Sequence, residues 1–217
     1  MTAYGDFDKY LQAQKRRVVL AEAEAMARGK YNRVGIAAEM RAGIFVWTGA
    51  AIEQFVASLL KEALEFISAQ PIVASDLRYE LFSFFCDRDF HGVRSGDQRV
   101  SWMSRIEIMR MLEAADPVVL TGSGPLDGKT IRPYHFEAIW MTFALPGSPW
   151  PGGVHQAVLK DLADRRNEVA HGSVDPVEFG RQRTFEDCLK MLGRIDEIAM
   201  HATIVLDSYL HSASYRR

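Results

Sequence analysis

Cysteine is scarce in this 217-residue chain. Its two cysteines, Cys86 and Cys188, lie far apart in unlike contexts, which excludes both a zinc-binding spacing and a disulfide framework. We therefore expect a reducing compartment. The chain also lacks an excess of charge of one sign. A formal net charge of -2 and a pI of about 6.3 exclude a globally basic surface of the kind that coats nucleic acid, although a local basic cleft is compatible with them.

Long apolar runs are absent as well. The first ten residues are charged and contain no apolar core, so they do not resemble a secretory signal. The longest apolar run, Gly43 to Ile52, is about half the length that spans a bilayer, and Arg41 and Glu53 bound it. We expect a cytoplasmic protein without a membrane partner.

Strand patterns are missing too. No alternation of apolar and polar residues persists beyond four or five positions, and the best candidate, PVVL at 117–120, is too short to organise a sheet. Apolar residues instead recur every three or four positions, which is typical of helices. The expected helices are 7–26, 34–67, 75–90 with Ser75 as N-cap, 97–115, 134–144, 153–171 and 184–210, with a short helical turn after Asp175-Pro176.

These patterns predict an all-α fold, an antiparallel helical bundle with extra helices. No repeat and no linker divides the chain, so we expect a single domain over 1–217. Its core helices should cover about 32–68, 153–171 and 184–212, and the one clear loop should cover 117–132.

The segment RRNEVAHG, residues 165–172, raises a chemical question. On a helix, Arg166 projects into an apolar face, whereas Arg165 lies at the solvated margin. A guanidinium on an apolar face must find acceptors or reach a solvated cleft, because an unpaired buried charge is costly. Arg41 and Asp196 lie on apolar faces of other helices, and Glu53 lies at the edge of one. One interpretation is therefore an internal ion-pair network of these charges.

His171 stands directly before Gly172, a residue type that ends helices in the left-handed conformation. The negative end of the helix dipole favours an imidazolium there, a placement that suits a general acid or base. A histidine that merely complements the dipole is the alternative. Arg166 and His171 lie about 140° apart on an ideal helix. For both to reach one point, either the end of the helix unwinds or a second copy contributes.

The segment from Arg166 to His171 matches the R-x4-6-H motif of the HEPN superfamily, in which a polar residue such as Asn167 often follows the arginine. LADRRNEVAHG resembles the helix end of the prokaryotic RiboL-PSP branch and of the related MAE branch. RAGIFVWTGAAIEQFVASLL, residues 41–60, resembles their opening core helix. The resemblance implies a HEPN-type helical bundle.

The resemblance also implies an activity. Many HEPN proteins are metal-independent endoribonucleases of toxin-antitoxin, anti-phage and RNA-processing systems, and they leave 2′,3′-cyclic phosphate and 5′-hydroxyl ends. By this resemblance His171 would move the proton, Arg166 would bind the phosphate and Asn167 would orient a neighbour or the substrate backbone. Arg165 is a weaker phosphate-binding candidate, and Glu53 and Asp196 are supporting or structural candidates.

The implied partners are RNA, a second copy whose motif faces the same cleft, and an antitoxin or other regulatory protein. No metal or other cofactor is implied. A different hypothesis is a non-catalytic HEPN-like module that binds RNA, a nucleotide or a protein, with Arg166 held by Asp196 or Glu53. Modification of this chain by a partner nucleotidyltransferase is a third hypothesis.

Two other motifs carry less weight. The loop SGPLDGKT, residues 123–130, ends like a phosphate-binding Walker A loop, but Ser123 replaces its first glycine and Pro125 removes a backbone N–H. The segment CDRDFHG, residues 86–92, offers Asp87, Asp89 and His91, whose alternate spacing fixes no metal geometry. A turn-rich loop and a solvated helix end are the simpler interpretations.

Overall fold

The computed structural model describes residues 1–27, 34–121 and 124–217. Within these ranges it contains helices and two isolated β-bridges but no β-strand, which confirms the all-α prediction. The start of the core helix expected at 32 and residues 122–123 of the expected loop lie outside the described residues. The helices are α1 (Thr2–Ala27), α2 (Val34–Ser68), α3 (Tyr79–Phe85), α4 (Asp87–Ser95), α5 (Gln98–Glu113), α6 (Pro133–Phe143), α7 (His155–Ala170), α8 (Pro176–Arg181) and α9 (Phe185–His211), with a 3-10 turn η2 (Ala74–Asp76).

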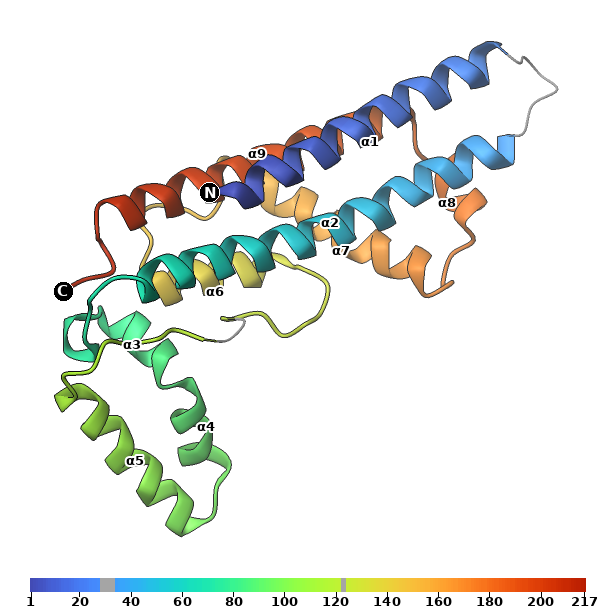
Figure 1. Ribbon diagram of the computed structural model, residues 1–217. Coiled ribbons are helices and arrows are strands. Elements are labelled where there is room, and N and C mark those ends of the chain that lie inside the picture. Colours follow the sequence, from blue (N-terminus) through green and yellow to red (C-terminus); the bar gives the residue numbers. More distant parts are fainter. Residues whose placement is uncertain (28–33, 122–123) are drawn as a thin grey trace.

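Four helices form the elongated body of the molecule. α1 and α7 run in one direction, and α2 and α9 run in the other (Figure 1). Both α1 and α7 contact α2 and α9, so the four apolar faces meet along a shared core. α1 is part of this core, with Phe7, Leu11 and Val18 buried, in addition to the three core helices that the sequence indicated.

The start of α1 is set by a residue of α2. The Glu62 carboxylate accepts hydrogen bonds from the backbone N–H groups of Thr2 and Ala3, at 2.9 Å each, and from the Thr2 hydroxyl. An anion at a helix N-terminus satisfies free N–H groups and complements the dipole. This long-range cap explains why the helix begins five residues before the periodicity that predicted it.

α8 packs unusually closely on α2. A Cβ atom added to Gly180 would lie 1.9 Å from the Ala38 carbonyl oxygen, so only glycine allows this approach. The Arg41 Nε atom donates to the Gly180 carbonyl at 2.8 Å, and the guanidinium lies 4.8 Å from the centre of the Phe185 ring. Arg41 is therefore satisfied by a backbone carbonyl and an aromatic ring.

The single helix expected over 75–90 is wrong. Ser75 lies inside the 3-10 turn, Leu77 and Arg78 are extended, and helices α3 and α4 follow. The reason is a long-range contact: the Arg78 N–H donates to the Tyr215 carbonyl at 2.9 Å, and the Arg217 N–H donates to the Asp76 carbonyl at 2.9 Å. The chain end thus holds this segment in a conformation that local periodicity does not reveal.

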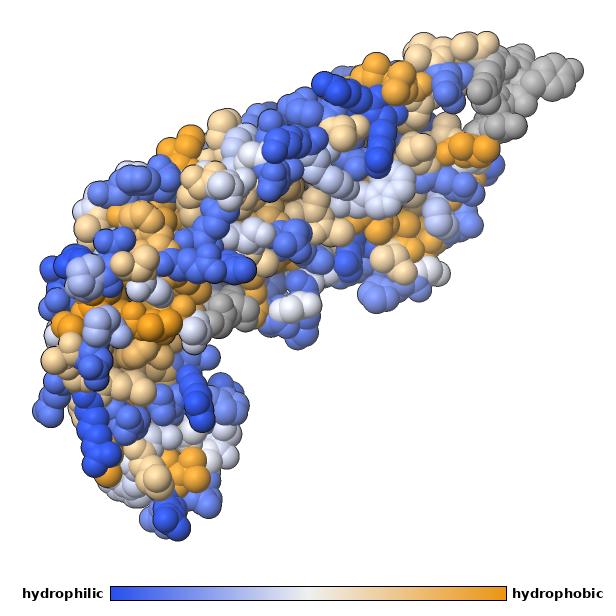
Figure 2. Space-filling view, in the orientation of Figure 1, coloured by the Kyte–Doolittle hydropathy of each residue, from blue (hydrophilic) through white to orange (hydrophobic). Residues whose placement is uncertain are grey.

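α4 and α5 pair with each other and project from one end of the body (Figure 1). Their attachment is narrow, because α5 otherwise contacts η2 and α4 contacts α3. Apolar residues reach the surface of this projection among polar ones (Figure 2).

α2 is apolar along most of its length. By length and composition alone, Gly35–Ser68 could cross a membrane, but half of the most apolar window is buried inside the protein. The central helix of a soluble bundle meets the same criteria. Cytoplasmic location stays a prediction.

Candidate functional site

The end of α7 carries the residues that the sequence singled out. The helix ends at Ala170, and His171 follows with φ -92° and ψ 2°. Gly172 has φ +69°, which confirms the predicted left-handed helix end. The Ser173 N–H reaches back to the Glu168 carbonyl at 2.9 Å, so a further turn of helix is blocked.

A cavity of about 370 Å³ lies between α2, the end of α7 and the loop before α6. Arg166, Asn167, His171 and Glu53 all border it. His171 and Arg166 thus border one cavity within a single chain, although they lie about 140° apart on an ideal helix. The remaining lining residues come from the loop and the start of α6, and the sequence reasoning did not assign them to the site: Gly128, Lys129, Thr130, Arg132 and Tyr134.

Arg166 is held by three side chains. Its Nη1 atom donates to Thr130 Oγ1 at 3.0 Å and to Asn167 Oδ1 at 3.1 Å, and its Nη2 atom lies 3.4 Å from both oxygens of Glu53. The Thr130 hydroxyl also donates to Asn167 Oδ1 at 2.8 Å, which closes a triangle of hydrogen bonds. Asn167 thus accepts twice through its oxygen and leaves its NH₂ group available as a donor.

The ion pair between Arg166 and Glu53 has incomplete hydrogen bonding. Arg166 Nε and Glu53 Oε1 are buried and make no hydrogen bond within the described residues. The two side chains are 23% and 29% exposed, so the pair is not sealed from the cavity. Buried polar atoms without partners are costly, so the ion pair between Arg166 and Glu53 is not an optimal internal contact.

Gly49 of α2 makes room for the arginine. A Cβ atom added there would lie 2.7 Å from Arg166 Cγ, too close for any real contact. The aliphatic part of Arg166 therefore crosses α2 at a position without a side chain, which directs its guanidinium toward Glu53 one turn further along.

The loop that brings Thr130 to Arg166 is anchored at two points. The ring of the fully buried His135 accepts the Arg132 N–H at Nδ1 (2.9 Å), and its Nε2 lies 3.0 Å from Asp127 Oδ1. The first contact requires an unprotonated Nδ1, so the ring is the tautomer that donates from Nε2. The Arg132 guanidinium reaches Asp164 of α7 at 2.7 Å.

Asp127 is the centre of this loop. It accepts the Lys129 N–H at 3.1 Å and the Tyr134 hydroxyl at 3.3 Å, besides its contact with His135. The hydrogen bond with His135 is the largest cause that lowers the pKa of Asp127 to about 2, and the N–H group and the charge of Lys129 add to it. The carboxylate therefore stays ionised and holds the loop at neutral pH.

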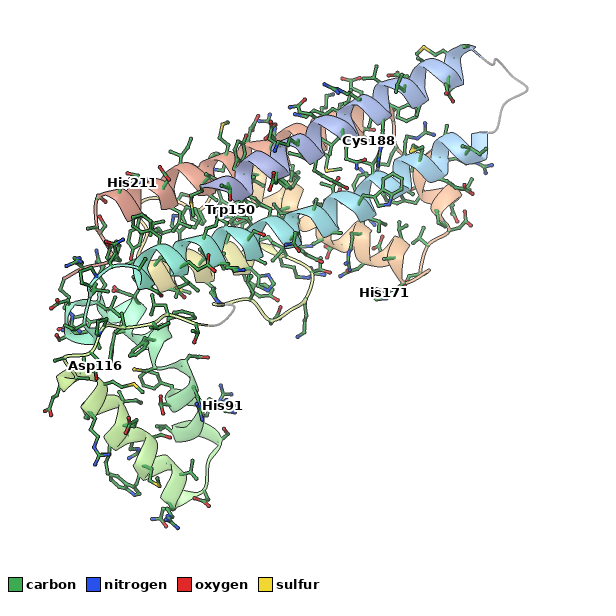
Figure 3. The ribbon with its side chains drawn as sticks, in the orientation of Figure 1. His91, Asp116, Trp150, His171, Cys188 and His211 are labelled. Atoms are coloured by element: carbon green, nitrogen blue, oxygen red, sulfur yellow. The ribbon has the colours of Figure 1, made fainter. Side chains whose placement is uncertain are left out.

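The His171 side chain is exposed. It points from the end of α7 away from the bundle (Figure 3), and no hydrogen bond or ion pair engages its ring within the described residues. At the edge of the cavity, such a ring can accept or donate a proton without first breaking an internal contact.

Arg165 is not part of the cavity. It lies on another side of α7, where its Nε atom donates to Asp161 at 3.2 Å and its Nη1 atom donates to Glu168 at 2.8 Å. The hydrogen bond to Glu168, together with Asp161, raises its pKa. The residue is half-buried and paired with two carboxylates, so the structure does not place this phosphate-binding candidate beside Arg166.

Asp196 is a correction to the expected network. It accepts from the Lys15 ammonium at 3.1 Å and the Tyr4 hydroxyl at 3.0 Å, both on α1, and it does not contact Arg166. The burial of Tyr4, followed by its hydrogen bond with Asp196, raises the pKa of Tyr4 to about 12. The four charges therefore do not form one network. Arg41 binds α8, Asp196 binds residues of α1, and Glu53 pairs with Arg166.

The molecule also has a larger groove of about 510 Å³ between α1 and α2, lined mostly by apolar side chains such as Phe7, Trp47 and Phe55. Its charged lining groups are two carboxylates, Asp6 and Glu62, and Glu62 already caps α1. The smaller cavity is the better functional candidate because several different polar side chains converge there.

Comparison with known proteins adds no relative: no family model, no curated protein and no solved structure matches this chain.

Cationic side chains outnumber carboxylates in the lining of the small cavity. Lys129, Arg132 and Arg166 border it with His171, against one lining carboxylate, Glu53. Arg132 is paired with Asp164 at 2.7 Å and Lys129 with Asp127 at 3.4 Å, and the exposed ammonium of Lys129 can leave its pair for an anion at little cost. A phosphate could find there a planar donor fork, a flexible ammonium and a neighbouring imidazole.

Proposed function

We propose that the protein is an endoribonuclease of the HEPN type that cleaves RNA at the cavity at the end of α7. The observation that carries the proposal is the convergence of Arg166, Asn167 and His171 on one cavity, together with the exposed Lys129. Such a cavity suits a phosphodiester, whose charge attracts cations and whose cleavage needs proton transfer.

The resemblance to HEPN proteins implies the reaction, and these groups have the chemistry that it needs. The 2′-hydroxyl of the RNA attacks the adjacent phosphorus, a P–O2′ bond forms, and the P–O5′ bond breaks. The 2′ oxygen loses its proton and the 5′ oxygen gains one, and His171 is the group that can take or return it. Arg166 stabilises the charge that develops on the phosphoryl oxygens, and the free NH₂ group of Asn167 contributes a neutral donor.

Glu53 and Thr130 have positioning roles in this scheme. They accept two of the hydrogen bonds that Arg166 donates and fix the plane of the guanidinium before RNA arrives. A preorganised donor costs less at the moment of reaction than one that must be ordered. The second copy with a facing motif, the regulatory partner, and the toxin or anti-phage role are further predictions of the HEPN resemblance.

A non-catalytic RNA-binding module is the second candidate, because the ion pair with Glu53 engages the same guanidinium. The test uses four variants with mixed-sequence RNA in excess EDTA. His171→Ala and Arg166→Ala should each lower the cleavage rate by about 100-fold or more. Two matched controls, Arg165→Ala next to the motif and His91→Ala at an exposed position on α4, should keep the rate within about threefold.

The outcomes separate the two candidates. Cleavage that needs both Arg166 and His171 supports the ribonuclease. RNA binding that falls with Arg166→Ala, without any cleavage by the wild type, assigns the binding module instead. Equal cleavage by all variants indicates a contaminating nuclease and contradicts the proposal.

A further inference from the structure

The outer face of α5 is an apolar surface that no other described helix covers. Four side chains on this face are 49–61% exposed: Trp102, Met103, Ile106 and Met109. They recur at the three- and four-residue spacing of a coiled-coil seam. The opposite face of α5, with Ile108 buried and Met111 and Leu112 half-buried, is the one that packs on the protein.

Charged residues stand at the two ends of this seam. Arg99 lies in the first turn of α5 and Glu113 is its last residue, two heptads apart, or about 21 Å along the axis. Both are exposed, and neither has an ion-pair partner within the described residues. Each also opposes the dipole of its own helix, which favours anions at the start and cations at the end. Their placement is thus not explained by interactions within the chain.

A second, antiparallel α5 satisfies both charges at once. With the two-fold axis at Ile106, Arg99 of each copy lies beside Glu113 of the other. Met103 of each copy then lies beside Met109 of the other, and the two Ile106 side chains meet at the centre. A parallel arrangement would instead place Arg99 against Arg99 and Glu113 against Glu113.

We propose that α5 is a homotypic docking surface through which two copies of this chain pair in antiparallel orientation about Ile106. The projection of the α4–α5 hairpin from the body leaves this face accessible (Figure 1). None of its residues borders the cavity at the end of α7, so the contact is independent of the proposed ribonuclease activity. One helix pair falls below about 1,200 Å² of buried surface, the range of reversible contacts.

Analytical ultracentrifugation tests the surface. The wild type should dimerise as its concentration rises through about 1–100 μM. Ile106→Asp should lose this association and keep the stoichiometry that the wild type has at its lowest concentration, with an unchanged far-UV circular dichroism spectrum. The matched control, Ile204→Asp at another exposed isoleucine, should dimerise like the wild type. A wild type that stays monomeric to about 1 mM, or a dimer that Ile106→Asp leaves unchanged, overturns the proposal.

Charge exchange tests the orientation. Arg99→Glu and Glu113→Arg should each weaken dimerisation about tenfold, because two attractive pairs become repulsive. The double variant should restore it to the wild-type value or better. Weakening in the double variant that equals the sum of the two single effects would contradict the antiparallel pairing.

Cysteine crosslinking tests the register. Ile106→Cys should form an intermolecular disulfide readily, whereas Glu113→Cys alone should not, because its two copies lie about 21 Å apart. A mixture of Glu113→Cys and Arg99→Cys should crosslink. Cys86 and Cys188 are fully buried and do not interfere. A monomeric wild type that binds phosphatidylglycerol vesicles through Ile106 would assign the surface to lipid and overturn the proposal.

Discussion

Replacing Gly49 with alanine tests the placement of Arg166 without reference to activity. Alanine stabilises a helix interior by about 0.8–1 kcal/mol relative to glycine. At this position, however, the added Cβ would lie 2.7 Å from Arg166 Cγ, near the middle of the arginine side chain. Overpacking of this kind typically costs about 1–3 kcal/mol. Gly49→Ala should therefore change the stability of the wild type by about 0 to 2 kcal/mol in the destabilising direction.

The same substitution should have the opposite sign once the arginine is removed. In the Arg166→Ala background the nearest atom is the Cβ of residue 166 at 3.3 Å, which needs only a small adjustment. Gly49→Ala should then stabilise by about 0.5–1 kcal/mol. The coupling energy of the double-mutant cycle is thus about 1–3 kcal/mol, and the cost of leaving Glu53 without its partner cancels.

Urea unfolding followed by far-UV circular dichroism measures the four proteins of the cycle. Gly193→Ala is the matched control, because this glycine lies inside α9 with no atom within 4 Å of an added Cβ. It should stabilise by about 0.8–1 kcal/mol in both backgrounds. If Gly49→Ala also stabilises both backgrounds equally, Arg166 does not cross α2 at Gly49 and the described site geometry is wrong.

Three further predictions concern the fold and the loop. Burial raises the pKa of Cys86 to about 12 and that of Cys188 to about 11, so neither thiol should react with Ellman's reagent at pH 8 until the protein unfolds. Gly180→Ala should destabilise by about 3 kcal/mol or more in urea unfolding, because its Cβ would meet a backbone carbonyl. The Asp127 carboxyl should titrate near pH 2 by carbon NMR, and His135→Asn should raise that pKa.

The lowered pKa of Asp127 determines the pH range in which its carboxylate stabilises the loop. The pKa is lower in the folded protein than in the unfolded chain, so the carboxylate stabilises the loop above about pH 4. That contribution is lost as the pH falls through about 2. A native Asp127 that titrates near its ordinary value would contradict the described hydrogen bonds to His135 and Lys129.

The parts of the fold that depend on local sequence were predictable. Capping residues and amphipathic spacing are local, so the ends of α7 and α9 and the short α8 after Asp175 agree with the expectation to within a few residues. The region 75–90 was not predictable, because its extended residues pair with the chain end more than 130 positions away. Periodicity contains no information on such a contact.

The candidate site also has residues that the sequence could predict and residues that it could not. The spacing of Arg166 and His171 is local and visible in the sequence, whereas Thr130 comes from a loop, and loops have no periodicity that would reveal their neighbours. Asp196 shows what a helical projection cannot reveal. The projection correctly indicates that the residue faces another helix, but not that this helix is α1 with Lys15.

The chemical identity of the RNA ends distinguishes attack by the 2′-hydroxyl from attack by water. After incubation of the wild type with RNA in excess EDTA, we expect 5′-hydroxyl ends and 2′,3′-cyclic phosphates, with no cleavage of 2′-O-methylated RNA. Fragments with 5′-phosphate and 3′-hydroxyl ends, or cleavage that survives the methylation, would contradict attack by the 2′-hydroxyl at the Arg166–His171 cavity.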